Sequence, residues 1–200
     1  MSGDAFFQAL GRQLRQGPPR SIEPGGMLLR EAAVLAPLFW RAGEPWVYLT
    51  MRPKTMRKHP GQISFPGGEK DPADLTPLHP ALREANEELG IPPEQVEVLG
   101  MLGAMPTVTS YYVTPFVGVV PAELRLTPNP AEVGELIEAP LRRLRLEKRF
   151  LYGADRDAFV WDDGQHVVWG ATWRMVRELA EHVRAASGSL SGAWSRGPGR

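Results

Sequence analysis

The chain has 200 residues, 42% of them hydrophobic, and its 23 basic and 23 acidic residues cancel to a formal net charge of zero at pH 7. This composition suits one globular domain with extensions, and the absence of cysteine excludes disulfides, thiolate zinc sites and cysteine nucleophiles. With no net charge, no apolar run of membrane length and no signal peptide, we expect a cytoplasmic protein that binds neither nucleic acid nor membranes.

The chain begins with a predicted amphipathic helix over residues 4–16. Phe7, Leu10 and Leu14 share one face of it, and Asp4 can cap its first turn. Two prolines and a Gly/Pro-rich linker follow, so we expect the helix to pack on the edge of a domain rather than to act as a functional arm.

The sequence divides into three parts. Residues 1–27 form the N-terminal helix and linker, and residues 28–186 hold the regular alternation of apolar and turn segments. Residues 187–200 are rich in Gly, Ser and Arg, and we expect them to be a disordered tail.

The first strands of the domain follow the linker. Residues 32–40 are an apolar run of strand length, in which Pro37 predicts an edge position or a bulge. Residues 41–44 read as a hairpin turn, 46–51 as the next strand and 62–65 as a short one.

A basic segment over residues 52–60 lies between these strands. It can be a phosphate-facing loop or a solvated basic loop, and its place in the sequence just before an acidic helix favours the first reading. Its charged or titratable residues are Arg52, Lys54, Arg57, Lys58 and His59, the last of which we take as an ordinary loop residue.

The most informative helix is predicted over residues 81–91. A Gly pair at 67–68 ends the preceding element, residues 71–80 read as loop, Pro80 opens the helix and Gly90 ends it. At about 100° per residue, one face carries the apolar positions Leu82, Ala85 and Leu89.

The opposite face of this helix carries Glu84, Glu87 and Glu88. Three neighbouring carboxylates repel one another, and Arg83, four residues before Glu87, can hold one of them. A solvated acidic face is one reading. The other is a Mg²⁺ site for phosphate chemistry, because Mg²⁺ takes oxygen ligands, waters and substrate phosphates.

The second half of the chain continues the alternation. Residues 95–105, 111–120 and 132–138 read as strands, with Pro115 again predicting an edge or a bulge. Short closing strands follow at 150–151, 159–161 and 166–169, with a hairpin turn at 162–164. A last helix begins at 169–172, and its core stripe is Trp173, Val176, Leu179, Ala180 and Val183.

The order of these elements suits an α/β fold, an α/β/α sandwich with a mixed sheet. The central stretch also resembles the box of the Nudix hydrolases, G-x5-E-x7-R-E-U-x-E-E-x-G-U, through Gly68 and Arg83-Glu84-Ala85-Asn86-Glu87-Glu88-Leu89-Gly90-Ile91. Here the spacing from Gly to Arg is one residue longer, Asp74 stands at the first Glu position, and Ala85 replaces a bulky aliphatic.

Segments around the box point to one branch of that family. Leu49–Arg52 and the run Arg57-x3-Gly61-x3-Phe65-Pro66-Gly67-Gly68 are similar to coenzyme A pyrophosphatases, although Pro53 departs from their pattern. The strong match covers residues 48–91, and Val113–Gly118 is similar to a later motif of the same branch.

The resemblance implies a Nudix sandwich and Mg²⁺-dependent hydrolysis, with Mn²⁺ able to substitute, of coenzyme A to 3′,5′-ADP and 4′-phosphopantetheine. Glu84 and Glu88 are the best metal ligands, with Glu87 as third ligand or general base. Arg83 orients a carboxylate, and a further acid comes from a later loop, for which Glu132 is the first candidate and Glu69 the second.

The substrate contacts implied for this site are basic or backbone groups, with an aromatic facing adenine or pantetheine: Arg52, Arg57, Lys58, Gly67 and Gly68, and Tyr111, Tyr112 or Phe116. Alternatives are another substrate, such as ADP-ribose or a dinucleoside polyphosphate, and a non-catalytic binding module. The intact set of carboxylates argues against the module. A monomer and a homodimer both stay open.

Overall fold

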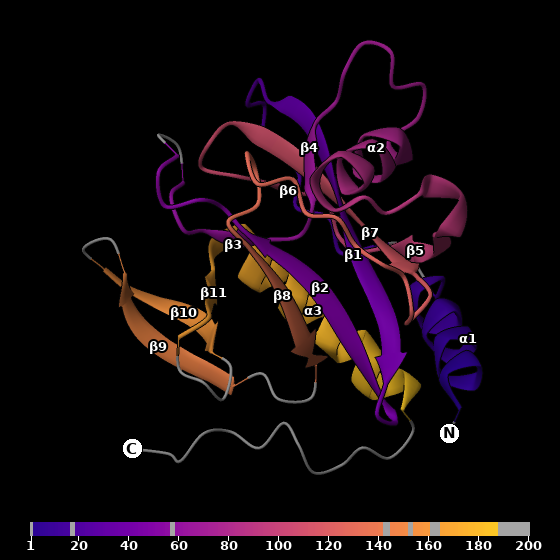
Figure 1. Cartoon of the computed structure of the whole chain (residues 1–200). Coiled ribbons are helices and arrows are strands. Elements are labelled where there is room, and N and C mark those ends of the chain that lie inside the picture. Colours follow the sequence, from indigo (N-terminus) through magenta and orange to yellow (C-terminus); the bar gives the residue numbers. More distant parts are fainter. Residues whose placement is uncertain are drawn as a thin grey trace.

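The computed structural model describes residues 2–16, 19–56, 59–141, 145–151, 154–160 and 165–187. Arg57, Lys58, the turn at 162–164 and the tail from 188 onward lie outside them. The elements, shown in Figure 1, are α1 Gly3–Leu14, β1 Arg30–Arg41, β2 Glu44–Met51, β3 Ile63–Ser64, β4 Gly67–Glu69, α2 Leu78–Leu89, η1 Pro93–Gln95, β5 Glu97–Met101, β6 Met105–Pro106, β7 Tyr111–Val119, β8 Glu135–Pro140, β9 Arg145–Leu151, β10 Ala154–Val160, β11 Val167–Trp169 and α3 Gly170–Ala186.

Strand β1 is the centre of a mixed sheet. It runs parallel to β7, from the pair Arg30–Tyr111 to the pair Leu38–Val119. Its other edge pairs antiparallel with β4 near its start and with β2 near its end. Strand β2 also pairs with β3 and β8, β5 and β6 pair with β7, and β9, β10 and β11 form a separate antiparallel sheet.

Neither strand proline lies on an edge strand, so the edge alternative of that expectation is wrong; each lies where the pairing on one side of its strand is interrupted. Pro37 falls between the last β4 partner of β1 and its first β2 partner. Pro115 falls where β5 ends and β6 begins, which also divides the single strand expected at 95–105. A proline has no N–H to donate, and in a gap between partner strands no carbonyl of a partner strand is left without its donor.

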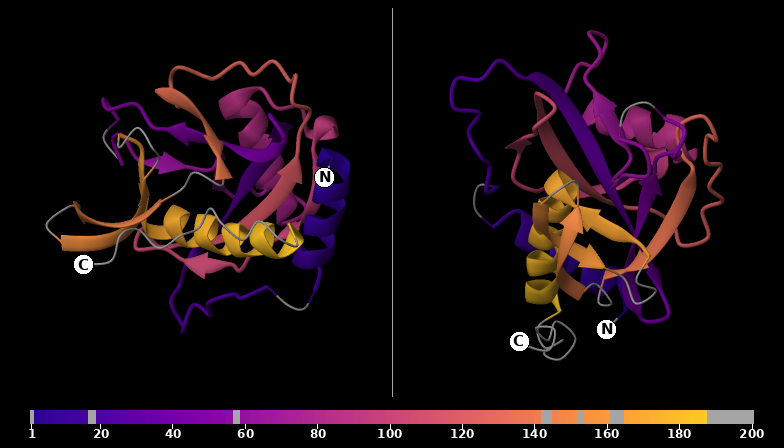
Figure 2. Two further views of the ribbon diagram at one scale, coloured as in Figure 1. Left: turned by 90° about the horizontal axis from the view of Figure 1, so that it is seen from below. Right: turned by 90° about the vertical axis from the view of Figure 1, so that its left-hand side faces the viewer.

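Helices cover both faces of the large sheet, which confirms the α/β/α sandwich (Figures 1 and 2). Helix α2 packs on one face, where its Ala81, Ala85 and Leu89 meet the core side chains Ala33, Leu35, Phe39, Tyr48 and Phe116. Helices α1 and α3 pack together on the other face, over Leu38, Val47, Leu49 and Val117.

The N-terminal helix belongs to this core. Phe6 and Leu10 are fully buried, and the Phe6 ring lies 5.3 Å from that of Trp40 in β1. The helix starts at Gly3, one residue before the predicted start, and its cap is two residues earlier than predicted, because the Ser2 hydroxyl, not Asp4, accepts the Ala5 N–H at 3.4 Å.

Helix α2 begins at Leu78, three residues before the predicted start, and ends as predicted. Pro80 lies in its first turn, where a missing N–H leaves no helix hydrogen bond unmade. Gly90 closes the helix in the left-handed conformation, with φ of 69°. The residues that follow this helix therefore leave it at a defined angle toward η1.

The last helix α3 carries an unexpected buried acid. Glu178 accepts the Gly103 N–H at 3.1 Å and so ties α3 to the segment between β5 and β6. Trp173, expected in the core stripe, is only partly buried. Within the described ranges, none of the helices has the length and apolar character needed to span a membrane.

Candidate active site

The glycine pair of β4 lies between the sheet and α2. A Cβ at Gly67 would come within 2.6 Å of Val34 Cα, and one at Gly68 within 2.5 Å of Glu84 Cδ. Neither approach is possible for a larger residue without moving backbone or carboxylate. The missing side chain at Gly68 therefore makes the space in which the Glu84 carboxylate lies, and the missing side chain at Gly67 lets β4 lie against β1.

Glu88 lies one turn after Glu84 and turns toward the sheet. It is 7% exposed, it accepts a hydrogen bond from the Gly67 N–H, and its Oε2 lies 3.5 Å from the Thr50 hydroxyl. We expected Glu88 on the helix face opposite Ala85, and that was wrong. Its carboxylate points instead toward the sheet, where the Thr50 hydroxyl and the Gly67 N–H contact it.

Glu132 reaches the same place from the loop between β7 and β8. The loop is bound to the end of α2, because Asn129 N–H donates to the Glu88 carbonyl and Thr127 N–H to the Leu89 carbonyl, both at 2.9 Å. The Asn129 side-chain amide donates to Glu132 Oε1 at 3.1 Å. These contacts hold the acid that the sequence nominated beside α2.

Carboxylate oxygens of Glu84, Glu88 and Glu132 lie within 4.8 Å of one another, and we call these three residues the acidic cluster. Converging carboxylate oxygens are the donors that hard divalent cations take. Of the described residues, Glu87 does not join this group; its side chain is 51% exposed and lies beside Arg83.

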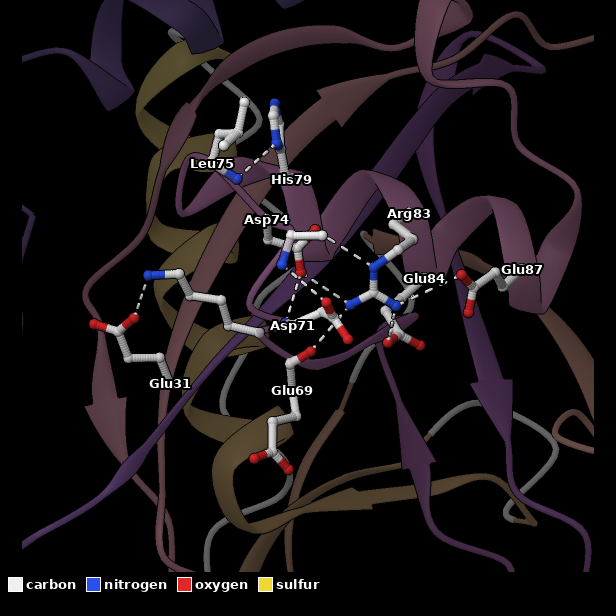
Figure 3. A network of polar contacts seen from close by, with 11 residues as sticks. Glu31, Glu69, Asp71, Asp74, Leu75, His79, Arg83, Glu84 and Glu87 are labelled. Carbon is white, nitrogen blue, oxygen red and sulfur yellow. Dashed lines mark hydrogen bonds and ion pairs between the residues drawn. The ribbon is translucent and has the colours of Figure 1, made fainter.

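Arg83 joins three parts of the site, namely the loop before α2, helix α2 itself and strand β4 (Figure 3). Its guanidinium donates to Glu84 Oε1 at 2.7 Å and to the Glu69 carbonyl at 3.0 Å. The predicted pairing with Glu87 is present at 3.6 Å, but Glu84 and Asp74 are closer partners. The guanidinium therefore orients a carboxylate of the acidic cluster while it is itself fixed from two other sides.

Asp74, for which the sequence predicted no role, is a further partner of Arg83. Its buried carboxylate lies 3.1 Å from Arg83 Nη2 and accepts the Asp71 N–H at 2.8 Å. The Arg83 hydrogen bond is the main cause that lowers the pKa of Asp74. Its position at the first acid of the box was the signal that could have identified it.

Burial and mutual repulsion raise the pKa of two members of the acidic cluster. Desolvation is the largest cause for Glu88, whose pKa rises to about 7, with further increases from Glu84 and Glu132 and opposition from the Gly67 N–H and Arg52. Desolvation also raises the pKa of Glu84, against the effect of Arg83. A bound cation would relieve this accumulation of negative charge.

Of the other residues predicted to contact the substrate or metal, Arg52 acts on the acidic cluster, whereas Phe116 and Glu69 do not face it. Arg52 is near enough for its charge to act on both Glu88 and Tyr111. Phe116, expected to face the substrate, is instead 9% exposed in the core under α2, so that expectation is wrong. Glu69 turns its carboxylate away to Arg30, at 2.8 Å, and to the Tyr111 hydroxyl.

Comparison with solved structures agrees with this architecture. A Nudix hydrolase from M. smegmatis, RenU, superposes with a TM-score of 0.52 at 19% identity, covering 87% of this chain and 97% of that one. The NUDIX domain of Shewanella oneidensis NrtR, solved with ADP ribose, gives a TM-score of 0.53 at 14% identity, covering 81% and 94%. At these identities the likeness concerns the fold.

Sequence comparison is more specific. Residues 29–161 match the model of the NUDIX domain. A protein of Photorhabdus laumondii named "Uncharacterized Nudix hydrolase NudL" is 38% identical over 173 residues, covering 84% of this chain and 90% of the relative. One of the same name from Enterobacter sp. strain 638 is 45% identical over 160 residues, covering 77% and 83%. With its box residues assembled into one site, the chain belongs to the Nudix hydrolase family.

Proposed function

We propose that this Nudix hydrolase cleaves the pyrophosphate bond of coenzyme A, or of a derivative, to give 3′,5′-ADP and 4′-phosphopantetheine with Mg²⁺ as cofactor. The observation that carries the proposal is the acidic cluster, on whose Glu88 the positive charge of Arg52 acts. A pyrophosphate between two organic groups needs both: oxygen ligands for a cation, and positive charge for the phosphoryl oxygens.

The residues present fit a divalent cation. Glu84, Glu88 and Glu132 offer the ligands, and the missing side chain of Gly68 leaves the Glu84 carboxylate its space. When bound, Mg²⁺ or Mn²⁺ neutralises phosphoryl charge and lowers the pKa of a coordinated water. Everything else in the site has to come from the chain itself.

The chain contributes orientation and charge. Arg83 holds the Glu84 carboxylate toward its neighbours, and Asp74 holds Arg83. Thr50 and the Gly67 N–H fix Glu88 from the sheet side. We assign the proton-accepting role to either Glu87, whose side chain is 51% exposed, or Glu132, which reaches the cluster from a later loop; Glu88 is buried.

The choice of coenzyme A rests on sequence rather than on a shape of the pocket. The run from Arg57 to Gly68 leads directly into β4, and β4 lines the acidic cluster through Gly67 and Gly68. Basic residues in this run, together with Arg52, are suited to a substrate that carries an extra phosphate on its ribose.

The test is a comparison of turnover under matched Mg²⁺. We expect kcat/KM for coenzyme A to exceed that for ADP-ribose and for diadenosine polyphosphates by about tenfold or more, with 3′,5′-ADP as the product. A clear preference for ADP-ribose would reject the coenzyme A assignment but keep the pyrophosphatase. No hydrolysis of any of these compounds, with metal bound, would reject both.

A further inference from the structure

Three residues form an ordered stack on the sheet close to the acidic cluster, and we call them the Arg30 platform: Arg30, Glu69 and Tyr111. The Arg30 guanidinium lies over the Tyr111 ring, with Cζ 4.1 Å from the ring centroid. Glu69 Oε2 accepts from Arg30 Nη1 at 2.8 Å and from the Tyr111 hydroxyl at 3.0 Å. The guanidinium is therefore held on one face by the Tyr111 ring and at one edge by the Glu69 carboxylate.

The platform is built on three adjacent strands. Arg30 in β1 is the register partner of Tyr111 in β7, and Glu69 in β4 pairs with Ala32 of β1. Each residue is at or near the end of its strand, where the chain leaves the sheet. This position exposes the upper side of the stack while the sheet holds its base, since Tyr111 packs against the core.

Glu69 links the platform to the acidic cluster. Its side chain holds Arg30 and Tyr111, and its backbone carbonyl accepts from Arg83, which also holds Glu84. Along β1, the partner of Gly68 is Ala33, three residues from Arg30, or about 10 Å at the usual strand rise. Side chains three positions apart in a strand point to opposite faces, so a nucleotide with its phosphate at the cluster would pass the end of the sheet to place its base on the platform.

A second connection runs through Arg52. Its charge acts on Glu88 in the acidic cluster and on Tyr111 in the platform. Arg52 therefore lies within electrostatic range of both residues. Its positive charge suits a phosphorylated sugar between them.

The chemistry of the stack selects its ligand. The Arg30 charge is already balanced by Glu69, which makes it a poor site for one more anion. Its plane is nonetheless open, because 54% of the Arg30 side chain is exposed. Guanidinium planes stack on aromatic faces, and unpaired nucleobases stack on guanidinium planes.

We propose that the Arg30 platform is the surface on which the nucleobase of the substrate stacks, with Glu69 and Tyr111 as residues that position the guanidinium. The stack would then run Tyr111, Arg30, base. The inference rests on the proposed function, since it requires that the substrate be a nucleotide. It does not require that the substrate be coenzyme A.

The chain offers a matched control at the other end of β1. Arg41 also lies over aromatic rings, 4.8 Å from the Phe39 centroid and 5.4 Å from that of Trp46, and it is paired with Glu138. Arg30 and Arg41 are the first and last residues of one strand, so they are far apart. Arg41→Ala removes the same type of stack without touching the site.

The experiment compares binding of AMP with binding of ribose 5-phosphate, which lacks only the base, by NMR titration of the full chain. In the wild type we expect AMP to bind about tenfold more tightly than ribose 5-phosphate, the range of one base stack. Arg30→Ala should reduce this ratio to near one, and Arg30→Lys, which keeps the charge but loses the plane, should do the same. Arg41→Ala should leave the ratio unchanged.

Three results would overturn the platform. The first is an unchanged ratio in Arg30→Ala with both affinities unchanged, the second is an unchanged ratio with both affinities equally weakened, which would mean that Arg30 binds phosphate, and the third is a ratio preserved in Arg30→Lys. Retained binding of ribose 5-phosphate shows that a variant is folded. If coenzyme A is not hydrolysed but the AMP ratio still depends on Arg30, the proposed substrate fails and the platform stands.

Discussion

The buried Asp74 carboxylate holds the Arg83 guanidinium at two nitrogens, with Nη2 at 3.1 Å and Nε at 3.4 Å. Asp71 and Asp74 close a turn in which Asp71 N–H donates to Asp74, and the turn carries the shorter acid side chain onto the arginine. The turn thereby places Asp74, at the first acid position of the box, against Arg83.

Asp74→Asn is expected to lower activity about tenfold to a hundredfold, because an amide cannot hold the guanidinium that orients Glu84. Steady-state kinetics with the best substrate measure the loss. Asp71→Asn is the matched control, since the Asp71 side chain accepts only the Ala73 N–H and does not contact Arg83. An equal loss in both variants would show that the turn, and not the pairing with Arg83, matters.

Glu84→Gln and Glu88→Gln should each reduce hydrolysis about a hundredfold or more, because each removes a charged oxygen ligand from the acidic cluster. Mn²⁺ affinity, followed by electron paramagnetic resonance, should fall in parallel. Glu132→Gln is expected to weaken Mn²⁺ more than Glu87→Gln does, because only the former lies in the cluster. Unchanged Mn²⁺ binding in both α2 variants would refute the metal assignment.

Thr50 gives a test of how Glu88 is positioned. Its buried hydroxyl lies 3.5 Å from Glu88 Oε2 and 3.4 Å from the Ser64 carbonyl. Thr50→Val keeps the shape but loses the donor, and we expect Mn²⁺ affinity to fall severalfold. Thr50→Ser keeps the hydroxyl and should retain most of the affinity; a similar loss in both variants would point to packing alone.

The pKa of Glu88 predicts how the stability of the metal-free protein depends on pH. Burial raises this pKa from 4.5 to about 7, so the folded state holds a proton that the unfolded state has already lost. The stabilisation is full below pH 4.5 and disappears as the pH rises through about 7, a change on the order of 3 kcal/mol.

Urea unfolding at a series of pH values checks this effect. As the pH rises from 4.5 to 8, the free energy of unfolding of the wild type should fall relative to that of Glu88→Gln, because the amide never ionises. Added Mg²⁺ should restore the wild type at pH 8 and do little for the variant. A constant difference between the two proteins across this range would contradict the prediction.

The sequence by itself determined the elements and the identity of the site helix. The apolar spacing of Ala85 and Leu89, the stop at Gly90 and the order of strands are local patterns, and each appears in the structure close to its predicted place. The acids of the helix and Arg83 were recognisable because a box with fixed spacing repeats the geometry of a helical turn.

Only the tertiary structure decided which acids converge. Glu88 faces the sheet because Gly67 and Thr50 receive it there, and Glu132 joins it because backbone hydrogen bonds dock its loop on the end of α2. Glu69, in contrast, turns to Arg30 and Tyr111. These outcomes depend on pairings between segments distant in the chain, and periodicity reports only the neighbours within one element.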